Sequence, residues 1–216
     1  MNIDFARNQM IEQQVRAWDV FDPDVLLALK TVPREQFVPD KYRSLAFADV
    51  EIPIGQQQVM LTPTYEGRIL QALELDGTEH VLDVGTGTGF LAACLATLAD
   101  KVTSIDIHAE FLELAGQNLK DSGIANIDLV QMDATAELPP GGFDAIAVTG
   151  SLEDFDPRFV EALNPGGRLF IVVGNAPLME ARVVERISDN DWRSSTIFET
   201  NMRPLVHGTK PPQFIF

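Results

Sequence analysis

Short apolar runs alternate with helix-like segments through the second half of the chain, and this alternation constrains the fold more than any other feature. Strands separated by helices of roughly 10–15 residues form right-handed βαβ units, which build a parallel, doubly wound sheet. The predicted strands are 80–84, 102–107, 127–131, 143–149 and 168–173. The predicted helices between them are 90–98, 109–119 and 157–163.

The two ends of the chain have a different texture from this middle part. A polar turn at 188–191 separates two strand-like runs, 182–187 and 194–200, which predicts an antiparallel hairpin at the end of the sheet. The first part of the chain predicts a helical cap with an irregular, proline-containing segment. The predicted cap helices are 1–18, 23–29 and 63–73, and the irregular segment is 33–61.

No repeat, low-complexity stretch or Gly/Ser linker divides the sequence, so we expect one domain of class α/β spanning 1–216. Within it, 1–76 would form the N-terminal helical cap and a substrate loop. Residues 77–216 would form the core, a mostly parallel sheet that ends in the antiparallel hairpin.

The charge of the chain excludes several classes of partner. The 216 residues carry 16 Lys and Arg against 32 Asp and Glu, a net charge of −16. A surface of this sign repels phosphate backbones and anionic lipid, so we expect no nucleic-acid and no membrane binding. The N-terminus has no apolar secretory region, and no apolar run approaches the ~18 residues of a membrane span. With one cysteine, Cys94, the sequence predicts a cytoplasmic protein whose thiol packs in the core.

A glycine-rich turn lies between the first predicted strand and the helix that follows it, where residues 83–90 read Asp-Val-Gly-Thr-Gly-Thr-Gly-Phe. Glycines there let the backbone approach a ligand without a Cβ clash, and the helix N-terminus points free N–H groups at it. The dinucleotide pattern G-x-G-x-x-G would require Gly or Ala where this chain has Phe90. S-adenosylmethionine carries an ammonium and a sulfonium instead of phosphates and matches better. We expect Asp83 to hold its ammonium, directly or through water.

Acidic residues also follow the next two predicted strands. Asp106 comes 21 residues after Gly85, where a doubly wound fold places the carboxylate that accepts from ribose hydroxyls. Asp133 follows the third strand, where a carboxylate can accept from the amino group of adenine. With acidic residues at three successive strand ends, the chain resembles class I methyltransferases. This resemblance implies that the cofactor is S-adenosyl-L-methionine, with S-adenosyl-L-homocysteine as product. The residues expected to line its site are Asp83, Gly85, Thr86, Gly87, Thr88, Gly89, Asp106, Ile107, Asp133, Ala134 and Thr149.

Motifs elsewhere in the chain carry a more specific resemblance. Val-Arg-Ala at 15–17, Val-Pro-Arg-Glu-Gln-Phe-Val-Pro at 32–39, Ala-Phe-Ala-Asp at 46–49 and Ile-Pro-Ile-Gly at 52–55 occur in that order. With Val-Thr at 148–149 and Arg-Pro-Leu-Val at 203–206, the chain resembles protein-L-isoaspartate O-methyltransferases over nearly its whole length. The resemblance implies methylation of the α-carboxylate of L-isoaspartyl residues, or the β-carboxylate of D-aspartate, in damaged peptides and proteins. It also makes the neighbouring His207 a candidate for the substrate pocket.

The segment after Gly55 departs from the family pattern. Where the family has close to His-Gly-Gln-Thr-Ile-Ser-Gln-Pro, residues 56–63 read Gln-Gln-Gln-Val-Met-Leu-Thr-Pro. Gln58 matches and is expected to bind substrate. Val59 and Leu61 stand where the family has the Thr and Ser that contribute to its substrate site, so Val59 is expected to bind substrate and Leu61 and Thr62 are the candidate catalytic positions. Either Thr62 supplies the hydroxyl that Leu61 lacks, or the acceptor has changed or activity is lost. The alternatives are thus a methyltransferase with another acceptor, or a non-catalytic protein that binds S-adenosylmethionine.

The expected chemistry requires no proton acceptor and no metal. A carboxylic acid with a pKa near ~4 is already ionised at neutral pH, so its methylation needs no general base. His80, His108 and His207 are scattered and lack metal-ligand spacing. We therefore predict no metal site.

Overall fold

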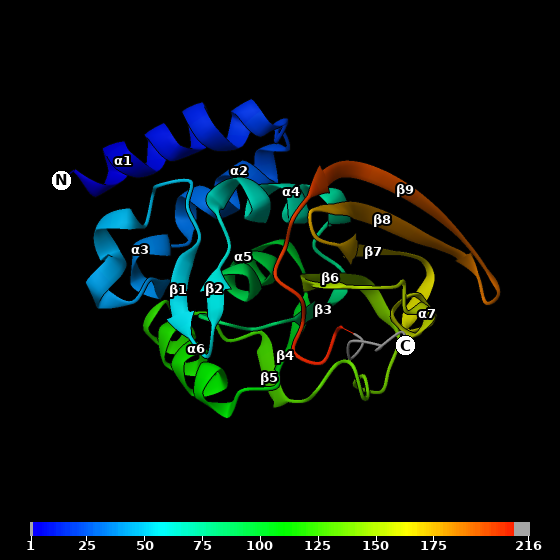
Figure 1. Ribbon diagram of the computed structural model, residues 1–216. Helices are drawn as coiled ribbons and strands as arrows, with labels where there is room; N and C mark the ends of the chain where they lie inside the picture. The colour runs from blue at the N-terminus through cyan, green and yellow to red at the C-terminus, as the bar shows by residue number, and fades with distance from the viewer. Residues whose placement is uncertain (1, 210–216) are drawn as a thin grey trace, which may run out of the picture.

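The computed structural model describes residues 2–209, and its centre is a seven-stranded sheet with the strand order β5-β4-β3-β6-β7-β8-β9 (Figure 1). The five strands from β5 to β7 are parallel, whereas β8 is antiparallel to both of its neighbours. The predicted α/β class, the five parallel strands and the C-terminal hairpin are therefore confirmed. The strands are β3 (His80–Val84), β4 (Lys101–Asp106), β5 (Ile127–Gln131), β6 (Phe143–Leu152), β7 (Leu163–Asn175), β8 (Leu178–Ser188) and β9 (Asp191–Thr200).

The central parallel strands β3 and β6 are buried on both faces, which explains why their sequences are largely apolar. Side chains alternate between the faces of a strand. Ala145 and Ala147 of β6 pack in the cluster that holds the apolar side of the cap, whereas Ile146 and Val148 pack in the cluster that holds Phe159 of α7. The helices around the sheet are α4 (Pro63–Leu73), α5 (Phe90–Leu98), α6 (Ala109–Asp121) and α7 (Pro157–Glu161).

Helical segments before residue 63 form a cap over one side of the sheet, and they share a single hydrophobic cluster with α4 and α5 (Figure 1). The sequence places capping side chains at two of the starts. Asn2 accepts from the N–H of Phe5, and Asp22, before a proline, accepts from the N–H groups of Asp24 and Val25. The predicted helix 1–18 is divided, because its middle is a π-helical turn. The cap contains α1 (Ile3–Met10), η1 (Ile11–Val15), η2 (Arg16–Trp18), α2 (Pro23–Thr31), α3 (Arg34–Phe37) and η3 (Asp40–Leu45).

The prediction of an irregular segment at 33–61 was wrong, because it contains α3, η3 and an antiparallel hairpin. The hairpin pairs β1 (Ile52–Gly55) with β2 (Gln58–Met60). Its turn residues Gln56 and Gln57 have φ angles of 48° and 59°, a left-handed conformation that Gly, Asn or Asp usually supplies. This hairpin was hard to predict because its strands are short and its turn has two glutamines in place of the usual Asn-Gly or Asp-Gly pair.

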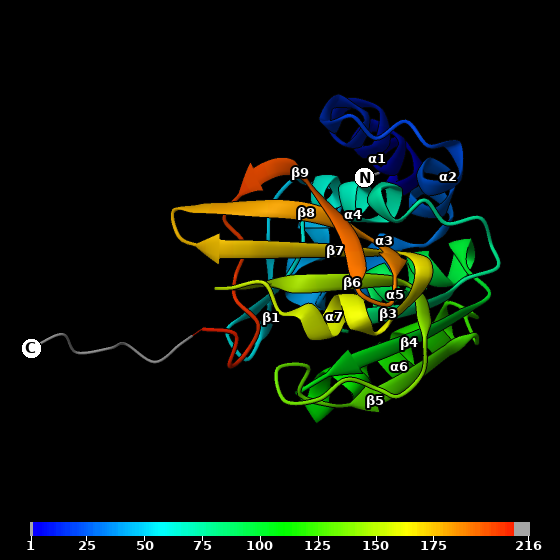
Figure 2. The same ribbon diagram turned by 90° about the vertical axis from the view of Figure 1, so that its right-hand side faces the viewer.

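After β9 the chain returns across the open end of the sheet (Figure 1). Ser151 of β6 holds this segment: its N–H donates to the carbonyl oxygen of Arg203 at 2.9 Å, and its own carbonyl accepts from the N–H of Leu205 at 3.0 Å. The Ser151 hydroxyl also donates to the carbonyl of Met202 at 2.9 Å. In Figure 2 the same segment, drawn in red, passes beside the ends of β6 and β7. Among residues 2–209, no helix has the length and apolarity to cross a bilayer.

Candidate functional site

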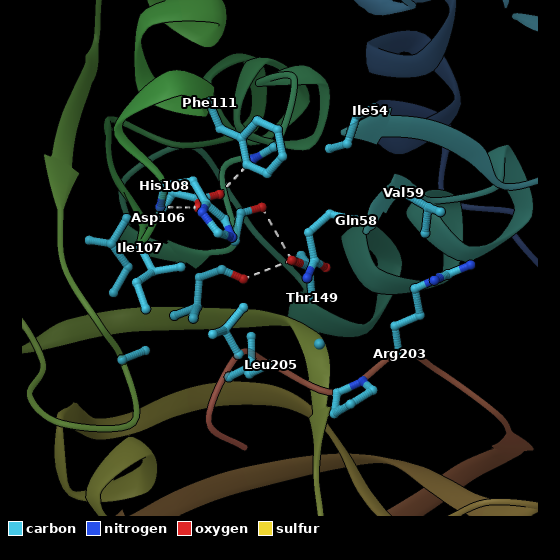
Figure 3. Close-up of a pocket in the computed structure, with 18 of the residues that line it drawn as sticks. Ile54, Gln58, Val59, Asp106, Ile107, His108, Phe111, Thr149, Arg203 and Leu205 are labelled. Carbon is cyan, nitrogen blue, oxygen red and sulfur yellow. Dashed lines mark hydrogen bonds between the residues drawn. The ribbon is translucent and has the colours of Figure 1, made fainter. Parts of the chain in front are cut away.

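A pocket opens at the carboxyl ends of the parallel strands, where β3 and β6 meet and the strand order reverses. Ligands of doubly wound folds bind at this switch point. The pocket encloses about 760 Å³ with its open mouth, within the range of small-molecule sites. Its walls come from the strand ends, from the β1–β2 hairpin and from the returning C-terminal segment (Figure 3). The residues of the predicted site that line it are Gln58, Val59, Leu61, Gly85, Gly87, Asp106, Ile107, Asp133, Ala134 and Thr149.

Two glycines of the turn allow the pocket wall to consist of bare backbone. Gly85 has a φ of 100°, and a Cβ there would overlap the hydroxyl of Thr149. That hydroxyl donates to the carbonyl of Val84 at 2.8 Å, which ties β6 to the start of the turn. Gly87 has a φ of 51° and faces the pocket. Gly89 has another role: its bare Cα admits Ala115 of α6, so it serves helix packing and does not line the pocket.

Asp106 sits at the end of β4 with its carboxylate fixed at the pocket wall. Its Oδ2 accepts from the N–H of Gly87 at 3.0 Å, and its Oδ1 accepts from the N–H of His108 at 2.9 Å. The residue is only 8% exposed, yet it lines the pocket (Figure 3). Because each oxygen has accepted a single hydrogen bond, each keeps a lone pair for a ligand. A pair of neighbouring hydroxyls matches this arrangement.

Asp133 and His207 come together at another part of the site. The Oδ1 of Asp133 accepts from the N–H and the hydroxyl of Thr135, at 2.9 and 2.6 Å. Its Oδ2 lies 2.8 Å from Nδ1 of His207. Burial acts to raise the pKa of Asp133, but the hydrogen bonds from Thr135 and His207 outweigh it and hold the pKa below its usual value. His207 itself does not line the pocket, so the structure places it behind the carboxylate of Asp133 and not in the lining, where a substrate residue was expected.

Asp83, Thr86 and Thr88 lie behind the glycine turn, outside the pocket lining. Asp83 is fully buried, and its Oδ2 accepts from the hydroxyl of Ser104, which is 2.7 Å from that of Thr86. Its Oδ1 has no hydrogen-bond partner among residues 2–209. Burial, with the nearby charge of Asp106, raises the pKa of Asp83 to about 7 although the Ser104 hydrogen bond opposes the rise. The Asp83 carboxylate therefore does not reach the pocket and would not contact a ligand there directly.

The loop that departs from the family pattern forms the opposite wall. Gln58, Val59 and Leu61 line the pocket, and the two apolar side chains leave the wall without hydroxyls there. Thr62 does not line it. Its Oγ1 accepts from the N–H of Tyr65 as the cap of α4 and lies 2.8 Å from the hydroxyl of Thr64. The hypothesis that Thr62 replaces the missing hydroxyl has no support from this arrangement.

Arg34, from the Val-Pro-Arg-Glu motif, fixes this loop from below. Its Nη2 donates to the carbonyl of Leu61 at 2.6 Å, and its Nε donates to the carbonyl of Ala46 at 2.8 Å. Its Nη1 pairs with the buried carboxylate of Glu66. The guanidinium also stacks over the ring of Phe90 at 4.7 Å. Arg34 therefore supports the pocket from the core and does not line it.

Several pocket residues had no role in the sequence-based prediction. Ile54 and Phe111 add apolar surface to the walls, and Arg203 and Glu51 bring opposite charges to the mouth. Phe111 lies in the first turn of α6, where an apolar residue is expected to pack in the core. Arg203 belongs to a segment that contacts with distant residues, among them the bridge to Ser151, bring over the pocket.

Comparison with known proteins agrees with this architecture. The family model for protein-L-isoaspartate(D-aspartate) O-methyltransferase matches residues 6–210. A protein-L-isoaspartate O-methyltransferase of Koribacter versatilis is 38% identical over 93% of this chain and 90% of its own, and protein-L-isoaspartate O-methyltransferase 1 of Rhodopseudomonas palustris is 36% identical over 93% and 82%.

Solved structures share the fold at lower identity. A structure from Plasmodium falciparum, described as a beta-aspartate methyltransferase in complex with S-adenosyl-L-homocysteine, superposes with a TM-score of 0.79 at 17% identity, covering 95% of this chain and 99% of its own. That likeness supports the doubly wound fold. The sequence matches go further, and the chain belongs to the protein-L-isoaspartate(D-aspartate) O-methyltransferase family.

Proposed function

We propose that the pocket binds S-adenosyl-L-methionine and that the protein methylates the carboxylate of isoaspartyl residues in peptides and proteins. The chain is an S-adenosylmethionine-dependent methyltransferase by family membership. The main support for placing the cofactor in this pocket is the carboxylate of Asp106. The N–H groups of Gly87 and His108 hold it, and it faces the pocket.

The residues present fit this cofactor. Asp106 would accept from the two ribose hydroxyls, and Asp133 would use the remaining lone pair of Oδ2 for the amino group of adenine. Gly85 and Gly87 leave room where a side chain would intrude. Ile107 and Ala134 supply apolar surface for the adenine ring. Asp83, fully buried, would act on the ammonium only through groups between them.

The work left to this chain is positioning. S-adenosylmethionine supplies a methyl group that is already activated by its bond to a sulfonium. The acceptor carboxylate, with a pKa near ~4, is ionised at neutral pH and needs no base. The protein must hold one carboxylate oxygen in line with the methyl–sulfur bond at roughly 3 Å. Val59 and Leu61 place apolar surface on the acceptor side of the pocket.

The partners that follow are proteins and peptides with isoaspartyl residues. We place the protein in the cytoplasm, where its buried free thiol, Cys94, would stay reduced. The net charge of −16 disfavours nucleic acid and anionic membranes as partners.

A two-part assay tests the proposal. Calorimetric titration with S-adenosylhomocysteine and with NAD should give heat only with the former. Transfer of labelled methyl from S-adenosylmethionine should then be measured on an isoaspartyl peptide and on the same peptide with ordinary aspartate. Methylation of the isoaspartyl peptide alone is the expected result. Binding of S-adenosylhomocysteine without transfer to either peptide would contradict the proposed acceptor, and would favour a methyltransferase for another acceptor or a binding protein.

A further inference from the structure

The pocket is acidic, although its proposed acceptor is an anion. Glu51, Asp106 and Asp133 all line it. Among the described residues of the lining, Arg203 is the one Lys or Arg side chain. A carboxylate entering a site with this composition meets repulsion from the three acidic groups unless a cation offsets them. The cofactor's sulfonium supplies part of that positive charge, and Arg203 is the cation that the protein itself supplies for an acidic acceptor.

Arg203 stands at the mouth, on the side of the hairpin. Its Nη1 donates to the carbonyl of Gln57 at 3.2 Å, and its Nε lies 3.6 Å from Oε2 of Glu51. Its side chain is 52% exposed, so the guanidinium keeps donors free toward solvent. Figure 3 shows it beside Val59, on the far side of the labelled residues from Asp106 and Ile107. The main chain of Arg203 is anchored by the N–H of Ser151.

We propose that Arg203 binds the acceptor carboxylate and positions it for methyl transfer, an inference that rests on the proposed function. The wall formed by Val59 and Leu61 has no hydroxyl to donate to a carboxylate. A guanidinium replaces such donors with stronger, charge-assisted hydrogen bonds in a planar geometry that matches a carboxylate. Arg203 thus supplies from the C-terminal segment what the hairpin lacks.

The reaction balances with Arg203 in this role. Arg203 holds one carboxylate oxygen, and the other oxygen forms the new C–O bond to the methyl carbon as the carbon–sulfur bond breaks. The electron pair of that bond stays on sulfur, and no proton moves. The acceptor loses its charge when it becomes an ester, so its ion pair with Arg203 ends with the reaction. Glu51 then remains as the anion beside the guanidinium, which favours release of the neutral ester.

Glu51 gives the proposal a second, opposite test. Because it lies against the same guanidinium, it competes with the acceptor carboxylate for Arg203. Glu51→Gln should therefore strengthen binding of an anionic acceptor, whereas Arg203→Gln should weaken it. Arg193 provides a matched control: it is an exposed arginine of β9, ion-paired with Glu185 at 2.5 Å, and does not line the pocket.

The experiment measures peptide binding at equilibrium to the complex of the protein with S-adenosylhomocysteine, followed by steady-state kinetics. Two peptides are compared, one with the free α-carboxylate of isoaspartate and one with a neutral α-carboxamide at that position. The wild type should prefer the carboxylate by about tenfold or more, the size of one charge-assisted hydrogen bond. Arg203→Gln should abolish this preference and raise KM while the Kd for S-adenosylhomocysteine stays within about twofold. Arg203→Lys should restore part of the preference, Glu51→Gln should increase it, and Arg193→Gln should leave it unchanged.

Two results would overturn the inference. One is an Arg203→Gln protein that still prefers the carboxylate as the wild type does. The other is an equal loss for both peptides, which would mean a structural role for the side chain. Failure of the proposed function is recognised separately, because a wild type that transfers no methyl group to isoaspartyl peptide can still be assayed for peptide binding and its dependence on Arg203.

Discussion

The Nη2 of Arg34 donates to the carbonyl oxygen of Leu61 across 2.6 Å, and this bond joins the buried motif of the cap to the wall of the pocket. The same guanidinium neutralises Glu66, which is buried in α4. Burial raises the pKa of Glu66, and the charge and hydrogen bond of Arg34 oppose that rise. One arginine thus stabilises both the fold and the position of the loop.

Arg34→Met should lower the free energy of unfolding by roughly 3–5 kcal/mol, because a buried carboxylate loses its cation. Urea denaturation of both proteins at one pH measures the difference. Adding Glu66→Leu should recover much of the loss, since the unpaired group is then gone. Arg43→Met, which removes an exposed pair with Asp40, serves as the control and should change the value by less than about 0.5 kcal/mol. A loss at Arg34 no larger than that at Arg43 would contradict this account.

Asp83 should make the folded state less stable as the pH rises. Its pKa is about 7 in the folded protein and about 4 when unfolded, so between these values the unfolded chain releases a proton that the folded chain keeps. The free energy of unfolding should therefore fall between about pH 4 and pH 7, by roughly 2–4 kcal/mol from this group.

Asp83→Asn tests this by removing the titration. Unfolding measured from pH 4 to 8 should show the variant gaining stability relative to the wild type as the pH rises. Asp128→Asn is the control: the hydrogen bond and charge of Lys101 lower the pKa of Asp128, so its titration lies below this range and its difference from the wild type should stay nearly constant from pH 4 to 8. A constant difference between Asp83→Asn and the wild type across the range would show that Asp83 is ionised in both states.

Asp106→Ala should weaken the binding of S-adenosylhomocysteine by about 1.5–3 kcal/mol, or roughly 10- to 150-fold in Kd, through loss of a charged acceptor. Calorimetric titration measures it, and thermal unfolding of the free proteins checks that the fold survives. Asp128→Ala, an exposed aspartate of β5 outside the pocket, should bind as the wild type does. Equal Kd values for Asp106→Ala and the wild type would remove Asp106 from the ligand site.

Gln57→Gly should stabilise the protein by roughly 0.5–1 kcal/mol, because Gln57 has a φ of 59° and glycine adopts this conformation without a Cβ penalty. Gln58→Gly, at the neighbouring strand position, should instead lose a similar amount. Thermal unfolding of the two variants gives the comparison. Lower stability of Gln57→Gly would mean that the left-handed turn carries no strain.

The sheet could be predicted because its signals are local and agree with one another. Apolar runs, a glycine turn and acidic residues at strand ends all indicated a doubly wound fold, and Asp106 and Asp133, which the sequence predicts for a cofactor site, both line one pocket. The placement of Asp83 could not be predicted in the same way. The sequence pattern of an aspartate at a strand end is the same whether its carboxylate faces a ligand or is buried beneath the turn. In this structure Asp83 is buried.

The acceptor side of the pocket depends on contacts between distant segments, which local patterns do not contain. Arg203 is brought to the mouth by the bridge between Ser151 and Pro204 and by its own contacts with Gln57 and Glu51. Thr62 illustrates a conflict within one residue: a Thr-Pro pair predicts a helix start, and a hydroxyl that caps α4 is not free to meet a substrate. The predicted helix start at Thr62 is confirmed, since Thr62 is the N-cap of α4.

Among the described residues that line the pocket, Arg203 is the one Lys or Arg side chain beside three acidic groups, and this balance affects which damaged sites the protein repairs. The attraction of its guanidinium acts over a few ångströms, whereas the net charge of −16 acts out to a screening length of about 8 Å in physiological salt. An isoaspartate flanked by lysine or arginine is drawn in by both. One flanked by further acidic residues must approach against the field before Arg203 can hold it. The charge context of a lesion, and not only its chemistry, thus ranks the sites that this protein reaches first.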